Sequence, residues 1–235
     1  IYSDAFISPT GTSLIYTATT ARLTYAMSEN RYAPSTLMGL NSKGVPARAV
    51  WINFCVGLIL FFPFPDWQAL IKFQSVAIVL AYGVGPISLL ALRKQAPDLI
   101  RPFRLPYHKT LCYLAFLVCN LLAYWSGWET IWRLMLGLLL GILLLIIYRC
   151  CTRREPYPLN LKHAAWLIPY FIGITAFSYF GYYGGTKALP ELWIFGGLIL
   201  YSAALLWLAT YTQQPKEHAR QLLFESGLLK LHSSN

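Results

Sequence analysis

Seven long apolar runs dominate the sequence and limit what it can fold into. They lie at about residues 5–26, 47–64, 69–92, 110–127, 131–148, 165–183 and 192–211. A helix needs about 20 mostly apolar residues to cross the roughly 30 Å of hydrocarbon in a bilayer. The sequence therefore predicts an all-α integral membrane protein with about seven transmembrane helices, in a membrane region that spans residues 1–212.

The composition excludes most soluble proteins. Hydrophobic residues make up 57% of the chain and charged residues only 12%, whereas soluble domains average about 45–50% apolar and about 25% charged residues. The chain has no P-loop, GxGxxG or HExxH motif and no Ser/His/Asp set, so we do not expect an enzyme. Its five cysteines show no metal-ligand spacing, and we expect no metal site, cofactor or disulfide framework.

Positive charges are concentrated in every second connection between the apolar runs. If each run crosses the membrane, sixteen of the 19 Lys and Arg residues lie on one side and three on the other. The three are Lys72, Arg133 and Lys187, and we expect Lys72 and Arg133 to extend to the interface. Because loops rich in Lys and Arg remain cytoplasmic, we expect the amino terminus of this chain outside and its carboxyl terminus inside a cell membrane, either inner or plasma. Charges dispersed between apolar runs do not indicate a nucleic-acid partner.

The two ends of the chain give further expectations. Residues 213–235 mix basic residues with Leu and Phe, which predicts a short amphipathic cytoplasmic tail lying on the inner leaflet or on the protein itself. The chain begins at Ile1 without the features of a signal peptide. We therefore expect a fragment or a processed piece of a longer protein.

The first apolar run is the most polar of the seven and contains the candidate binding residues. Thr10, Ser13 and Thr17 share one helical face, and Thr12 and Thr19 align two turns apart. Hydroxyls on this run, with Thr12 and Ser13 as the candidates, can ligate a cation or lie beside a proton site. The alternative is that they bond to neighbouring helices or back to the preceding turn.

Asp4 is the only acidic residue at the start of this run. A carboxylate beside a membrane cavity can carry a proton, because burial raises its pKa. The alternative is a solvated helix cap at the outer interface.

Pro86, with Gly83 and Gly85, interrupts the third run near its middle. Proline removes a helical hydrogen bond and allows a kink. The kink is either a gating hinge or a static bend, and the sequence leaves both open.

Two loops go beyond a generic membrane protein. Residues 20–34, TARLTYAMSENRYAP, are followed by residues 41–46, NSKGVP. They resemble the end of the eighth helix and the next loop in amino acid permeases of the amino acid, polyamine and organocation (APC) superfamily, with the pattern S-R-x-x-x-A-M-A-R-D-G-x-x-P, then N-K-x-G-x-P. The matching residues are Arg22, Ala26, Met27, Pro34, Lys43, Gly44 and Pro46. One departure is Ser28-Glu29-Asn30-Arg31, where the family commonly has A-R-D-G.

The second loop, residues 92–106, reads LRKQAPDLIRPFRLP. It is similar to the L-R-x-x-x-P-x-x-x-R-P-F-[KR]-x-P loop after the tenth helix of the same permeases. The resemblance covers most of residues 5–150, the helix pair at 165–211 is similar to the fourteen-helix members, and the overall pattern is closest to the aspartate/proton symporter-like branch.

The resemblance implies a partial leucine-transporter-like fold that begins near the eighth helix. In such folds the substrate binds at broken helices, and the resemblance places these, the first and sixth helices, outside this chain. It implies secondary active transport of an amino acid, expected as proton symport with a sodium ion as the other candidate for coupling, and the missing amino-terminal helices are needed for a complete transporter. The alternative is a non-transporting structural or accessory membrane subunit.

Overall fold

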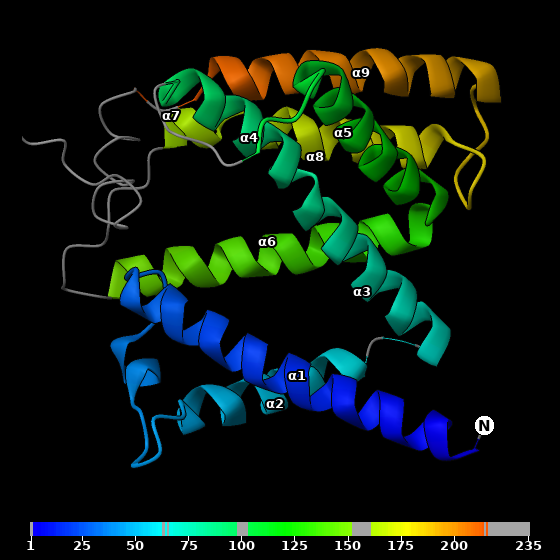
Figure 1. Ribbon diagram of the computed structural model, residues 1–235. Helices are drawn as coiled ribbons and strands as arrows, with labels where there is room; N and C mark the ends of the chain where they lie inside the picture. Colours follow the sequence, from blue (N-terminus) through cyan, green and yellow to red (C-terminus); the bar gives the residue numbers. More distant parts are fainter. Residues whose placement is uncertain are drawn as a thin grey trace, which may run out of the picture. The chain divides into compact units, whose positions relative to one another are not determined.

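The computed structural model describes residues 2–62, 64, 66–97, 103–151, 161–213 and 215, with side chains for 6–62, 64, 66–97, 103–151, 162–213 and 215. Within them all regular elements are helical (Figure 1). The elements are α1 (Tyr2–Glu29), the 3-10 helix η1 (Ser35–Met38), α2 (Ala47–Phe61), α3 (Trp67–Tyr82), α4 (Val84–Gln95), α5 (His108–Trp125), α6 (Trp128–Cys151), α7 (Leu161–Ala164), α8 (Leu167–Phe180) and α9 (Glu191–Tyr211). They form two compact units, residues 1–70 with 137–159 and residues 71–136 with 160–235.

Each of the seven expected segments overlaps a helix. Three helical stretches of the described chain are long and apolar enough to cross a membrane: Trp67–Gln95, which joins α3 and α4, then α6 and α9. In α6 only 6% of the most apolar stretch is buried. An apolar helix with so much uncovered surface is stable in lipid and unfavourable in water. The expected tail lies outside the described residues, apart from residues 213 and 215.

In the first unit, α1 ends in a turn that satisfies its last carbonyl groups. The Tyr32 N–H donates to the Met27 carbonyl over 2.8 Å, and the Arg31 N–H donates to the Ser28 carbonyl over 3.0 Å. Arg31 adopts a φ of 62°. This is the Schellman arrangement, in which a left-handed residue, usually glycine, follows the helix. The departure from A-R-D-G therefore puts an arginine where the backbone favours glycine.

The loop before α2 folds around Asn41. Its Oδ1 accepts hydrogen bonds from the Lys43 and Val45 N–H groups, over 2.9 and 3.0 Å. Gly44 supplies a φ of 71°, which costs glycine little. α2 starts directly after Pro46. The NSKGVP sequence therefore forms a turn that closes the connection between α1 and α2.

α1 and α2 pack against each other in this unit (Figure 1). The contact uses small residues, since Ala21 is 2% exposed and Ala49 is fully buried. Small side chains let two helix backbones approach closely, which is the usual packing device in membranes. Arg48 adds a hydrogen bond from Nη1 to the Thr36 carbonyl, 3.3 Å long, and so ties α2 to η1.

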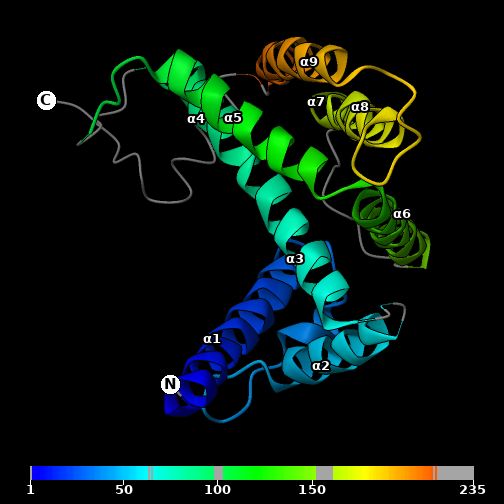
Figure 2. The ribbon, with the colours of Figure 1, turned by 90° about the vertical axis from the view of Figure 1, so that its right-hand side faces the viewer.

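In the second unit, α5 packs against α4, α8 and α9 (Figure 2). At its centre lies Asn120, which is fully buried. Its Nδ2 donates to Ser202 Oγ over 2.9 Å, and its Oδ1 accepts from Tyr170 Oη over 3.0 Å. One amide therefore joins α5, α8 and α9. Apolar side chains surround this contact, with Phe116 and Leu198 almost completely buried.

The third expected span is interrupted where the sequence predicts. α3 ends at Tyr82 and α4 begins at Val84, so Gly83 separates them. Pro86 lies in the first turn of α4 and has no N–H to donate to the Tyr82 carbonyl. A Cβ at Gly83 would lie 3.2 Å from the Leu80 carbonyl oxygen and in ordinary contact, 3.6 Å, with the Phe116 ring of α5. Whether this break moves stays a prediction.

Arg31→Gly should raise the free energy of unfolding by about 1 kcal/mol, because a non-glycine residue pays about 1–2 kcal/mol in the left-handed region. Denaturant titration in mixed micelles measures it. Arg31→Ala is the matched control, since it removes the same side chain and retains the strain. An equal gain in both variants would attribute the effect to charge or side-chain contacts.

Asn120→Ala and Tyr170→Phe should show a coupling energy of about 0.6–1.7 kcal/mol in a double-mutant cycle of unfolding, the range for hydrogen bonds between membrane helices. Tyr113→Phe provides the control, because its hydroxyl donates to the Ile199 carbonyl and does not touch Asn120. Its coupling with Asn120→Ala should be near zero. Additive effects of Asn120→Ala and Tyr170→Phe would contradict the network.

Candidate functional site

Seven threonine and serine hydroxyls of α1 share one hydrogen-bonding pattern. Each donates to the carbonyl oxygen four residues earlier in the same helix, over 2.7–2.9 Å. The donors are Thr10, Thr12, Ser13, Thr17, Thr19, Thr20 and Thr24. Back-bonding of this kind satisfies a hydroxyl proton inside an apolar medium without a second helix.

The structure places the three candidate residues along one helix but does not gather them. Thr12 donates to the Ser8 carbonyl and Ser13 to the Pro9 carbonyl, and both residues are exposed. Asp4 belongs to α1, and its side chain lies outside the described part. At 1.5 Å per residue, Asp4 is about 12 Å from Thr12 along the helix axis. A single site cannot combine all three through direct contact with one small ion.

Further along α1, a groove of about 440 Å³ lies beside the contact between α1 and α2 and is lined by both helices. It is lined by Tyr16, Thr17 and Thr20 of α1 and by Val50, Trp51, Asn53 and Phe54 of α2. We call this the α1–α2 groove. Aromatic and aliphatic walls with a few polar groups are typical of small-molecule sites.

Asn53 is the polar group that α2 contributes to this groove. The Thr24 hydroxyl shares its single proton between the Thr20 carbonyl, at 2.9 Å, and Asn53 Oδ1, at 3.1 Å. The buried Nδ2 of Asn53 has no hydrogen-bond partner among the described residues. A buried donor without an acceptor costs about 1–3 kcal/mol. An acceptor brought into the groove would recover part of that energy, so Asn53 is a candidate binding residue.

The sequence did not single out Asn53, although a signal exists. Within the described part of the second apolar run it is the only amide, and polar residues in membrane spans usually have a functional or packing role. Asn53 contacts Thr24 because α1 and α2 pack against each other, and hydrophobic periodicity does not specify how two helices pack. Among the described residues, no group of His, Cys, Asp and Glu could hold a metal ion.

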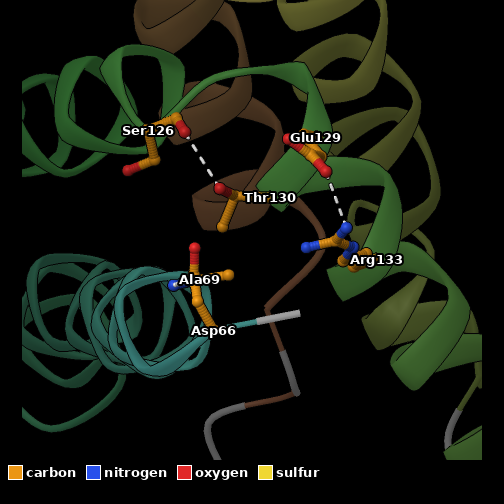
Figure 3. Close-up of polar contacts among 6 residues, drawn as sticks. All are labelled: Asp66, Ala69, Ser126, Glu129, Thr130 and Arg133. Atoms are coloured by element: carbon orange, nitrogen blue, oxygen red, sulfur yellow. Dashed lines mark hydrogen bonds and ion pairs between the residues drawn. The ribbon is translucent and has the colours of Figure 1, made fainter. Parts of the chain in front are cut away.

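Two charged groups near the ends of expected spans have local structural roles (Figure 3). Asp66 Oδ1 accepts from the Ala69 N–H over 2.6 Å and so caps the start of α3. In α6, Arg133 pairs with Glu129 over 2.6 Å, and its guanidinium lies 5.9 Å from the centre of the Trp132 ring. Near Glu129, the Thr130 hydroxyl donates to the Ser126 carbonyl over 3.0 Å. Exposed i,i+4 pairs contribute only about 0.3–0.5 kcal/mol, so Arg133 is held locally.

A protein-family model described as amino acid permease matches residues 1–148. The chain belongs to the amino acid permease family. The match includes α1, the α1–α2 groove and the central Asn120. Membership of this family makes the chain part of a multi-pass membrane protein. The match confirms the resemblance that the two loops indicated.

Curated relatives extend the match beyond residue 148. The permease chain is 33% identical to the glutamate/serine transporter AimA of Bacillus subtilis (strain 168), over 95% of this chain and 43% of that protein. It is 37% identical to the aspartate-proton symporter of the same organism, over 91% of this chain and 42% of that protein. A third relative there, the branched-chain amino acid permease BcaP, is 29% identical over 54% of this chain and 27% of its own length.

The permease chain spans less than half of the length of these relatives. No solved structure matches it. The candidate site residues of this chain, such as Asn53, therefore come from the packing of α1 and α2 and not from a solved relative.

Proposed function

We propose that the permease chain belongs to a secondary active transporter that carries amino acids, coupled to protons by symport. The names of two relatives support the substrate class, since one is a glutamate/serine transporter and the other an aspartate-proton symporter. The described residues support a binding role because α1 carries a continuous set of hydroxyls beside the α1–α2 groove. These residues bind and position; they offer no covalent chemistry.

The observation that carries the proposal is the polarity of α1 within a family-matched region. Seven back-bonded hydroxyls lie on a helix that also exposes Phe6, Leu14 and Ile15. Polar groups are costly in a bilayer and usually face other helices or a water-filled path. We propose that Thr12 and Ser13 lie beside the path of the coupling ion and that Asp4 carries a proton at its outer end.

We further propose that transport requires helices beyond those in this chain. The relatives are more than twice as long as the part that this chain matches. In transporters of the broken-helix type, unwound backbone at the bilayer midplane supplies the groups that hold the substrate. The polar face of α1 would then complete a site whose other wall comes from those helices.

The coupling role predicts a specific effect in the whole transporter that carries this chain. Thr12→Ala and Ser13→Ala should reduce the stimulation of aspartate, glutamate or serine uptake by an imposed proton gradient by about fivefold, because one lost ligand hydrogen bond is worth about 1 kcal/mol. Uptake into membrane vesicles, with and without the gradient, measures the ratio. A sodium gradient tested in parallel distinguishes the coupling ion.

Thr19→Ala is the matched control, since Thr19 makes the same bond to the carbonyl four residues earlier, 2.8 Å long. It should keep the wild-type ratio. Normal gradient dependence in all three variants, at normal abundance, would make the α1 hydroxyls a packing feature. Absence of amino acid uptake by the complete protein would instead favour the structural or accessory subunit.

We propose that the loop after α4 is cytoplasmic and that the loop between α8 and α9 is outside, following the charge distribution. In a background without the native cysteines, Lys94→Cys should react with an impermeant maleimide only after permeabilisation of cells, and Leu189→Cys should react before it. Both residues are exposed, so accessibility within the protein does not limit the reaction. The reverse pattern would contradict the proposed orientation.

A further inference from the structure

The connection between α4 and α5 concentrates positive charge. Arg93 and Lys94 lie in the last turn of α4, and His108 and Lys109 begin α5. We call these four residues the basic cluster. The described carboxylates of the same unit, Glu129 and Glu191, belong to the first turns of α6 and α9. Glu129 follows the far end of α5, which is about 27 Å long at 1.5 Å per residue.

Arg93 is the least solvated member of the basic cluster. Its Nε is buried and has no hydrogen-bond partner. α4 packs against α5, and the charge of Arg93 acts on both His108 and Cys112, which are one turn apart in α5. Among the described residues no acceptor binds this Nε. Phosphate oxygens match the planar set of donors that a guanidinium presents.

The electrostatic environment of His108 is positive. Desolvation lowers the pKa of His108 from its usual value, and the charges of Arg93 and Lys109 lower it further. α5 also begins without a side-chain cap, so the positive end of its dipole adds to the same field. An anion at this point would be attracted by all of these groups.

Exposed aromatic residues indicate which kind of anion fits. Phe103 is 72% exposed and Tyr107 is 84% exposed, and both lie in the connection that carries the charges. The expected spans 69–92 and 110–127 end on either side of it. Aromatic rings at such positions lie at headgroup depth in a membrane. A soluble anion would gain nothing from these rings, whereas a lipid would be contacted at its phosphate and along its glycerol and upper acyl region.

We propose that the basic cluster binds the phosphate of an anionic phospholipid, with Phe103 and Tyr107 holding the connection in the headgroup layer. Arg93 supplies the buried donor, and Lys94, His108 and Lys109 supply the surrounding charge. The lipid phosphate provides an acceptor for the Arg93 guanidinium. Because the site uses α4 and α5 alone, it does not depend on the proposed transport activity.

Thermal unfolding of the purified chain in mixed micelles tests the proposal, with phosphatidylglycerol titrated into phosphatidylcholine. The wild-type Tm should rise with phosphatidylglycerol and saturate. Arg93→Gln should weaken the apparent affinity about tenfold, as expected for loss of a charge-assisted hydrogen bond. Lys109→Gln should weaken it about fivefold, since one basic residue near an anionic surface contributes about 1 kcal/mol.

Lys72→Gln is the matched control, because it removes one exposed positive charge from the same unit. It should change the affinity less than about twofold, as expected for an exposed charge that touches no bound lipid. An equal loss in Lys72→Gln and Arg93→Gln would show a diffuse charge effect and overturn the site. Stabilisation by inorganic phosphate to the same extent would overturn the choice of a lipid.

Asp98→Asn separates the lipid from an acceptor within the chain, since Asp98 lies near Arg93 in sequence and outside the described residues. It should retain the response to phosphatidylglycerol. If Arg93→Gln and Asp98→Asn lower the Tm equally in phosphatidylcholine alone, and Arg93→Gln still responds to phosphatidylglycerol, the proposal is wrong. Retained lipid affinity in Arg93→Gln would overturn it in any case.

Discussion

In hydrocarbon every polar group must find its partner within the protein, and this requirement shapes each part of the chain. It forces the backbone into helices, because only a helix satisfies its own N–H and C=O groups along a single segment. It also explains why the hydroxyls of α1 bond back to their own helix and why Asn120 joins three helices through one amide. Among the described residues, Asn53 Nδ2 and Arg93 Nε are buried without a hydrogen-bond partner. Such groups therefore indicate positions where a ligand could supply the acceptor.

The Asn120 network also joins the part of the chain that the family model matches to a part that lies beyond the match. Asn120 lies within the region matched by the family model, whereas Tyr170 and Ser202 lie beyond residue 148. A helix pair added to a membrane core gains little from the hydrophobic effect, since lipid is as apolar as its partner. Directional hydrogen bonds to a buried amide supply a defined position for α8 and α9 against α5.

Much of the fold was predictable because apolar runs have a length that only helices use in a membrane. The interruption beside Pro86 followed from the lost N–H, and its location at Gly83 needed only the position of the proline. The left-handed turn at Arg31 was not predictable from periodicity, because arginine gives no local signal for positive φ. For the site, the sequence located the hydroxyls of α1 but not the α1–α2 groove, since Asn53 reaches Thr24 only through the packing of α2 against α1.

The hydrogen bonds from the α1 hydroxyls to their own helix also decide which part of each hydroxyl group is left for other partners. A free hydroxyl is amphoteric and can turn either its proton or its lone pairs toward a visitor. Thr10, Ser13 and Thr17 have already committed their protons to their own carbonyls. The hydroxyl oxygens of these three exposed residues therefore present lone pairs, and this face of α1 is rich in hydrogen-bond acceptors.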